Sequence, residues 1–113
     1  MKELTRSEEA VLLAIIRLKD NAYGVTIRDQ IKDVTKREFV YGTLYSTLEQ
    51  LVNKGYISKQ SGDPTPERGG KRKVFFKLTK EGLSALQNNF VINKTVWQGI
   101  TDETFDPGMI NEK

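Results

Sequence analysis

The sequence predicts a mainly α-helical domain with one small β-hairpin and a long helix at its C-terminal end. Several segments repeat their apolar residues at helical spacing, and two short alternating stretches flank a basic segment rich in Gly and Pro. The chain has 113 residues, of which 37% are hydrophobic and 29% charged, and this suits one soluble globular domain.

The residue inventory excludes several kinds of function. The chain has no Cys and no His, which removes disulfides, zinc fingers and His- or Cys-based catalysis. No nucleophile-base pair or paired carboxylate stands out, so we expect neither an enzyme nor a metal or cofactor site. No apolar run approaches the roughly 18 residues of a membrane span, and the first four residues lack the apolar core of a secretory signal. We expect a cytoplasmic protein that does not associate with membranes.

The first helix is expected at residues 7–19. Thr5 and Glu8 have the spacing of a capping box. The apolar residues between positions 11 and 18 cover nearly the whole circumference of this helix, so it must be buried on more than one side. We expect a partner chain to cover one of these sides, with Leu12 and Ile16 at the interface.

Two further helices are expected after a turn at residues 20–24. The second spans residues 25–34 and directs Ile27, Ile31 and Val34 toward the core. The third spans about residues 39–54 and ends at Gly55, a suitable left-handed cap. Its apolar stripe is Leu44, Leu48 and Leu51, and its opposite side carries Thr43, Ser46, Gln50 and Asn53.

Two strands should follow at residues 56–60 and 73–78, joined by a long tip at 61–72. This order of elements is the plan of a winged helix-turn-helix: helix, helix, turn, helix, strand, basic hairpin and strand. A helix about 10–12 Å across fits a DNA major groove about 12 Å wide. We therefore expect the segment Tyr41–Asn53 to be the recognition helix, with Tyr41, Thr43, Tyr45, Ser46 and Gln50 as candidate base readers. Tyr41 and Tyr45 have an alternative interpretation as core aromatics at the helix edge.

The basic residues concentrate in the same part of the chain. Residues 36–80 contain ten Lys or Arg and four acids, although the net charge of the whole chain is only +3. Arg68, Lys71, Arg72 and Lys73 surround two glycines at the hairpin tip and are expected to neutralise phosphates, as are Lys36 and Arg37 before the third helix. A solvated hairpin tip and a solvated turn are the alternatives for these two groups.

The final helix is expected to follow Thr79 and to reach residue 100. Leu83, Leu86, Phe90, Asn93, Trp97 and Ile100 repeat at steps of three and four, the pattern of a helix-packing seam. We expect a homodimer held by this seam, with two recognition helices about 34 Å apart on palindromic double-stranded DNA. Packing of the seam on the chain's own core is the alternative. The expected organisation is a DNA-binding domain at 1–79, a dimerisation helix at 80–100 and a flexible tail at 101–113.

Several motifs together resemble the PadR family of bacterial transcriptional regulators. They are the segments at residues 23–28, 42–48 and 51–57, Gly69 to Lys73, and Leu78 to Gly82. The resemblance covers about residues 8–100 and implies a homodimeric, repressor-like protein whose C-terminal helix packs on the partner's first helix. Some members respond to phenolic acids or flat lipophilic drugs near the dimer interface, which would make Trp97 the candidate stacking surface for a small aromatic or lipophilic inducer. Trp97 as plain dimer core is the alternative.

Two other functions remain open from the sequence. A winged helix used as a protein-interaction module would show no salt-dependent DNA binding and would bind a different protein through its third helix. A small enzyme would lose turnover on mutation of Asp29 or Glu49.

Overall fold

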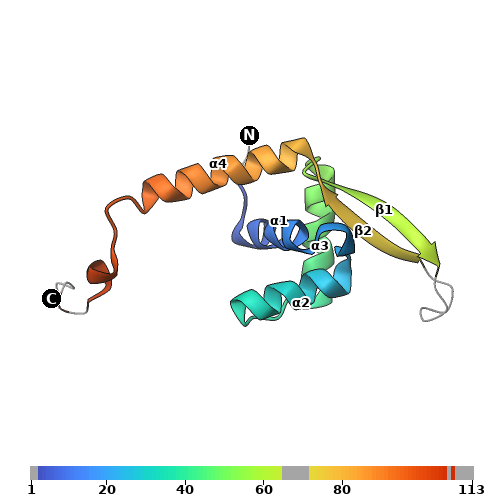
Figure 1. Cartoon of the computed structure of the whole chain (residues 1–113), viewed down its shortest axis with the longest axis horizontal. Coiled ribbons are helices and arrows are strands. Elements are labelled where there is room, and N and C mark those ends of the chain that lie inside the picture. Colours follow the sequence, from blue (N-terminus) through green and yellow to red (C-terminus); the bar gives the residue numbers. More distant parts are fainter. Residues whose placement is uncertain (1–2, 65–71, 107, 109–113) are drawn as a thin grey trace.

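The computed structural model describes residues 3–64, 72–106 and 108. Three helices form a body, a two-stranded hairpin leaves it on one side, and a long helix extends from it on the other (Figure 1). The elements in chain order are α1 (Arg6–Leu18), the 3-10 helix η1 (Lys19–Asn21), α2 (Gly24–Thr35), α3 (Tyr41–Asn53), β1 (Ile57–Pro64), β2 (Arg72–Leu78), α4 (Lys80–Val96) and the 3-10 helix η3 (Asp102–Phe105). The predicted fold class is confirmed.

The start of α1 is fixed by the predicted capping box. The backbone N–H of Glu8 donates to Thr5 Oγ1 at 3.1 Å, and the backbone N–H of Thr5 donates to Glu8 Oε1 at 2.9 Å. The Glu8 side chain is only 1% exposed, and its second oxygen accepts a hydrogen bond from Lys54 Nζ at 2.5 Å. Lys54 is the residue directly after α3, so this ion pair ties the start of α1 to the end of α3.

The core lies where α1, α2 and α3 meet the base of the hairpin. Ile27 and Ile31 are buried on α2, as predicted, but Val34 is 53% exposed and that prediction is wrong. Val34 lies in the last turn of α2, where the helix has passed beyond the core. The buried apolar set is Val11, Leu12, Ala14, Ile15, Ala22, Ile27, Ile31, Leu44, Leu48, Leu51, Tyr56, Ile57, Phe76, Ala85 and Leu86.

The hairpin is longer than the sequence pattern indicated. Strands β1 and β2 are antiparallel, with Ile57 opposite Leu78, and the pairing continues to Pro64 opposite Arg72 with an irregularity after Ser61. Residues 61–64 were expected in the tip because they lack apolar alternation. Backbone pairing in a solvated ribbon does not require that alternation. The base of the hairpin is held to the body because Phe76 N donates to Ala22 O at 2.8 Å.

Helix α4 starts where predicted and ends earlier. Thr79 Oγ1 accepts from the backbone N–H of Gly82 at 3.0 Å and donates to Gly55 O at 2.6 Å. The helix ends at Val96, four residues before the expected end. Gly99 has φ +84°, a left-handed conformation that a continuous helix excludes. Within the expected tail, residues 102–105 form the 3-10 helix η3.

Gly82 allows α4 to approach the end of α3 closely. A Cβ atom at Gly82 would lie 2.1 Å from the carbonyl oxygen of Tyr56 and 2.7 Å from a Leu78 methyl group. We therefore expect Gly82→Ala to lower the free energy of unfolding by about 1–3 kcal/mol in chemical denaturation, because backbone must move. Gly42→Ala is the matched control: nothing lies within 4 Å of a Cβ there, and we expect a gain of about 0.5–1 kcal/mol. Equal effects of the two substitutions would contradict this packing.

No helix within the described residues has both the length and the apolar character needed to cross a membrane.

Candidate nucleic-acid interface

Helix α3 separates into a buried side and an exposed side, as predicted. Its three leucines are buried in the core, whereas Thr43, Ser46 and Gln50 are exposed. Val40 provides the N-cap position without any side-chain hydrogen bond. The first-turn N–H groups of α3 therefore carry no side-chain cap, and such groups at a helix N-terminus suit phosphate oxygens.

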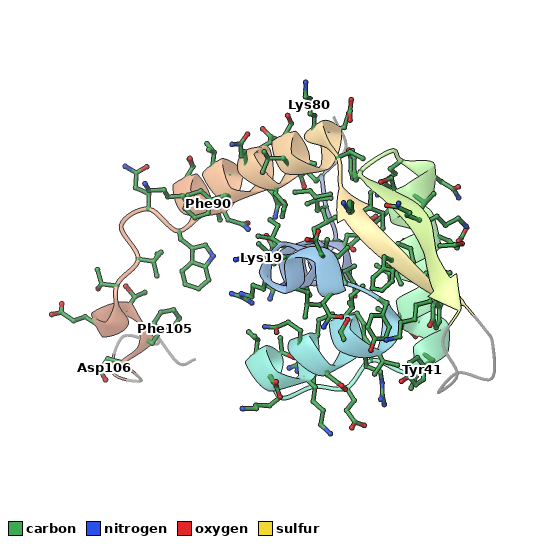
Figure 2. All side chains as sticks on the ribbon, turned by 45° about the vertical axis from the view of Figure 1, so that its right-hand side comes forward. Lys19, Tyr41, Lys80, Phe90, Phe105 and Asp106 are labelled. Carbon is green, nitrogen blue, oxygen red and sulfur yellow. The ribbon has the colours of Figure 1, made fainter. Side chains whose placement is uncertain are left out.

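Tyr41 and Tyr45 lie on the surface of α3 and not in the core. Their side chains are 42% and 48% exposed, and their rings stack at a centroid distance of 6.2 Å with 22° between the planes. Figure 2 shows Tyr41 at the edge of the body. The interpretation as core aromatics is wrong for both residues, since each leaves much of its ring to the solvent.

Arg28 holds this aromatic pair in place and was not among the predicted site residues. Its guanidinium carbon lies 4.6 Å from the centroid of the Tyr41 ring. Arg28 Nε donates to Phe39 O at 2.8 Å, and its Nη2 lies 3.9 Å from Glu38 Oε2. Arg28 is the last residue of the segment at residues 23–28, one of the segments that resemble the PadR family.

A second set of contacts joins the hairpin to α3. Lys73 Nζ lies 4.5 Å from the centroid of the Tyr23 ring, and that ring meets Phe75 edge-on at 5.6 Å. Gly24, the next residue, leaves room for the hydroxyl of Tyr45, because a Cβ atom there would lie 2.2 Å from it. Lys73 on β2 is thus connected through the start of α2 to the exposed side of α3.

The turn between α2 and α3 carries two exposed cations. Lys36 has φ +62°, which turns the chain out of α2, and Arg37 N donates to Thr35 Oγ1 at 3.1 Å. Neither cation forms an ion pair with any residue that the structure describes. Both are therefore free to bind an anionic partner.

The acid in this turn is neutralised by its neighbours. Lys32 Nζ lies 2.7 Å from Glu38 Oε1, and this hydrogen bond lowers the pKa of Glu38 and raises the pKa of Lys32. Arg28 adds a second positive charge beside the same carboxylate. Glu38 therefore stays ionised and paired, which reduces its repulsion of a polyanion near α3.

The tip of the hairpin is described only in part. Arg68 and Lys71 lie outside the described residues, and Arg72 is placed only as the first residue of β2. Lys73 is the one predicted wing cation whose side-chain contacts the structure describes.

The candidate dimer surface is smaller than the sequence indicated. Leu12 and Leu86 belong to the chain's own core, so neither is available on the surface, and this part of the expectation is corrected. Asn93, the polar member of the seam, donates with Asn89 to the carboxylate of Glu9 on α1 of the same chain. The exposed remainder of the expected surface is Ile16, Leu83, Phe90, Trp97 and Ile100.

Trp97 lies just after α4 and is 55% exposed. Its indole faces the ring of Phe105 at a centroid distance of 6.0 Å. Lys94, Thr95, Trp97 and Gln98 line an open hollow of about 450 Å³. The Trp97 ring is thus accessible in the single chain, and its role in ligand stacking stays a prediction.

Three helices followed by a two-stranded hairpin, with the polar side of α3 exposed, are the arrangement of the winged-helix class of transcriptional regulators. The model of the PadR-like family of transcriptional regulators matches residues 12–88, and the chain belongs to this family. The family consists of regulators and not of enzymes, in agreement with the sequence interpretation.

The chain is also similar to several solved structures. A PadR family transcription regulator from Clostridium difficile R20291 is 27% identical, with a TM-score of 0.63, and the match covers 88% of this chain and 95% of that one. A PadR-like transcription factor from Bacteroides fragilis is 28% identical, with a TM-score of 0.65 and coverage of 79% and 84%. RosR from H. salinarum is 25% identical, with a TM-score of 0.68 and coverage of 89% and 84%. A search of curated proteins found no match.

Proposed function

We propose that the protein is a homodimeric repressor that binds palindromic double-stranded DNA. Helix α3 enters the major groove, and Thr43, Ser46 and Gln50 contact base edges. The cations of the α2–α3 turn and of the hairpin contact the phosphate backbone.

The exposed polar side of α3, which is joined to β2 through the start of α2, supports this proposal most strongly. Polar side chains at the centre of this face are of the types that hydrogen-bond to bases. The uncapped first turn of α3 and the unpaired Lys36 and Arg37 border the same helix. Phosphate contacts at these positions would set the register in which the polar side chains meet the bases.

The Tyr41 and Tyr45 pair has a separate role in the proposal. Its exposed ring edges are apolar surface beside the polar readers, and apolar side chains recognise the methyl group of thymine. The Arg28 guanidinium contacts the Tyr41 ring and is itself held by a hydrogen bond to Phe39 O. The aromatic pair is therefore restrained before DNA binds. Restraint in the free protein reduces the conformational entropy lost on binding.

Dimerisation supplies the second half of the site. One α3 contacts only a few base pairs, and a two-fold dimer places the second copy one turn of DNA away. The exposed apolar residues of α4, including Phe90 and Val91, provide a surface for this contact. An aromatic ligand that stacks on Trp97 remains a prediction from the family resemblance.

Gln50→Ala and Ser46→Ala test base recognition. On a duplex enriched from a random-sequence pool, each substitution is expected to weaken binding by about 1–3 kcal/mol in fluorescence anisotropy. On a scrambled duplex the same variants should bind as the unchanged protein does. Ser84→Ala, an exposed serine on α4, is the matched control and should alter neither affinity.

Lys73→Ala tests backbone contact separately. It should weaken binding to the enriched and the scrambled duplex alike and reduce the slope of log affinity against log salt by about 1. Lys94→Ala on α4 is its control. If all these variants bound like the unchanged protein, the face would not read DNA, and the interpretation as a protein-interaction module would take its place.

A further inference from the structure

An apolar groove between α1 and α2 remains unoccupied by the rest of the described chain. It has a volume of about 460 Å³, within the range of about 300–1,000 Å³ in which proteins hold compact ligands. Ala10 and Leu13 of α1 and Ile31 and Val34 of α2 provide apolar lining, and Phe39 closes one end. Leu13 and Val34 are exposed in the single chain, so a partner that filled the groove would bury them.

The rim of this groove is positively charged. Arg6, Arg17 and Arg37 line it, all three are exposed, and none forms an ion pair with any described residue. Glu9, the acid in the lining, is already bonded to Asn89 of α4. The groove therefore suits an apolar segment with acidic neighbours.

The segment after α4 has this composition. Trp97, Ile100 and Phe105 are each more than two-fifths exposed, and the same stretch carries acids at positions 102, 103 and 106. The two aromatic rings of the segment lie beside each other and both remain more than half exposed. Apolar side chains of this size are rarely left so exposed together unless another surface covers them.

The geometry of α4 favours the groove of a second copy. Helix α4 carries the segment away from the three-helix body, and η3 lies at the far end of the molecule from the hairpin (Figure 1). The principal-axis extents of 62 × 28 × 22 Å show how far the chain is drawn out. In Figure 2, Phe90 and Phe105 lie along this extension. The groove is also continuous with the proposed dimer surface, because Leu13 lies on α1 close to Ile16.

We propose that residues 97–106 of each protomer dock into the α1–α2 groove of the other protomer, with the aromatic rings on the apolar lining and the acids near Arg6 and Arg17 of the rim, which leaves Arg37 to the DNA phosphates. This inference rests on the dimer proposed above and goes beyond it, since the groove between α1 and α2 lies outside the α4 seam and residues 101–106 follow Ile100, the last residue of that seam.

The docked segment would contact the turn that precedes the recognition helix. Arg37 and Phe39 line the groove, and Phe39 O holds Arg28, which in turn supports Tyr41. One protomer would in this way fix the position of the other protomer's α3. The spacing of the two recognition helices would then depend on the tail as well as on α4.

Engineered disulfides test this docking directly, because the chain has no natural cysteine. The double variant Val34→Cys/Thr104→Cys places one thiol in the groove and one on η3 and leaves the aromatic residues intact. After mild oxidation we expect most of the protein to run as a covalent dimer on a non-reducing gel. Val25→Cys/Thr104→Cys is the matched control: Val25 is an exposed valine of α2 outside the groove lining, and this variant should stay largely unlinked.

The other outcomes overturn the inference in distinguishable ways. An internal disulfide in a monomer would show that the segment folds onto its own groove. Absence of a cross-link in a protein that is dimeric by light scattering would reject the docking and leave the proposed function intact. A protein that is monomeric at the same concentration would reject the dimer itself.

Phe105→Ser provides an independent measurement without cross-linking. It should raise the dissociation constant of the dimer by at least about tenfold, as expected for an aromatic anchor in a pocket. The circular dichroism spectrum should not change, because Phe105 is exposed in the single chain. An unchanged dissociation constant would contradict the docking.

Discussion

Phe90→Glu is expected to convert the proposed dimer into a monomer and to weaken binding to the enriched duplex by at least about a hundredfold. Loss of one of two linked half-site contacts removes an avidity of about 10²–10⁴. Phe90 is 65% exposed in the single chain, so the substitution should leave the monomer folded. Sedimentation velocity measures the first effect and fluorescence anisotropy the second.

Asn88→Glu is the matched control for this substitution. Asn88 is exposed on α4, two residues before Phe90, and lies off the apolar stripe. This variant adds the same charge to the same helix and should remain dimeric with unchanged affinity. A Phe90→Glu protein that stayed dimeric would show that this face of α4 is not part of the dimer interface.

Lys54→Met is expected to lower the free energy of unfolding by about 3 kcal/mol at neutral pH, because it leaves a buried carboxylate without its partner. Glu8 is almost fully buried, and Lys54 Nζ is its only cationic contact among the described residues. Chemical denaturation measures this loss. Lys59→Met is the control, because the Lys59 and Glu49 pair is more than half exposed on both sides and is worth at most about 1 kcal/mol.

The Glu8 and Lys54 pair also makes the stability of the fold depend on pH. Burial acts to raise the pKa of Glu8, but hydrogen bonds from Lys54 and Thr5 and the charge of Lys54 outweigh it, and the pKa lies below its ordinary value of 4.5. The ion pair therefore stabilises the fold above about pH 4.5, and this contribution is lost as the pH falls through the lowered pKa. In Lys54→Met the hydrogen bond and the charge of Lys54 no longer favour the ionised form of Glu8, so the two proteins should approach each other in stability as the pH falls. A constant difference between pH 7 and pH 4 would contradict this account.

Local signals allowed most of the fold to be predicted. The spacing of Thr5 and Glu8 gave the start of α1, and Gly55, with φ +79°, ends the α3 region as expected. The alternation of polar and leucine positions on α3 separated its two sides correctly. Such features depend on residues that are only a few positions apart, so a single sequence is enough to predict them.

Contacts between distant residues could not be predicted in the same way. Glu8 was assigned only to its cap, and its pairing with Lys54 requires the packing of α1 on α3. Leu12 of the all-round apolar first helix and Leu86 of the seam were expected at the dimer interface. An apolar pattern indicates which residues must be covered, not whether the chain's own core or a partner covers them. Arg28 of α2 contacts the ring of Tyr41 on α3, and the sequence alone does not show this contact. The continuous period of α4 likewise concealed the break near Gly99.

Selection of bound duplexes from a random-sequence pool with the purified protein tests most directly whether α3 reads DNA in a two-fold dimer. We expect enrichment of a palindrome whose half-sites are centred about one turn, or 10–10.5 base pairs, apart. Two identical half-sites in inverted orientation would demonstrate both sequence reading and two-fold symmetry. A pool that shows no enriched sequence after repeated rounds would contradict the claim that α3 reads DNA.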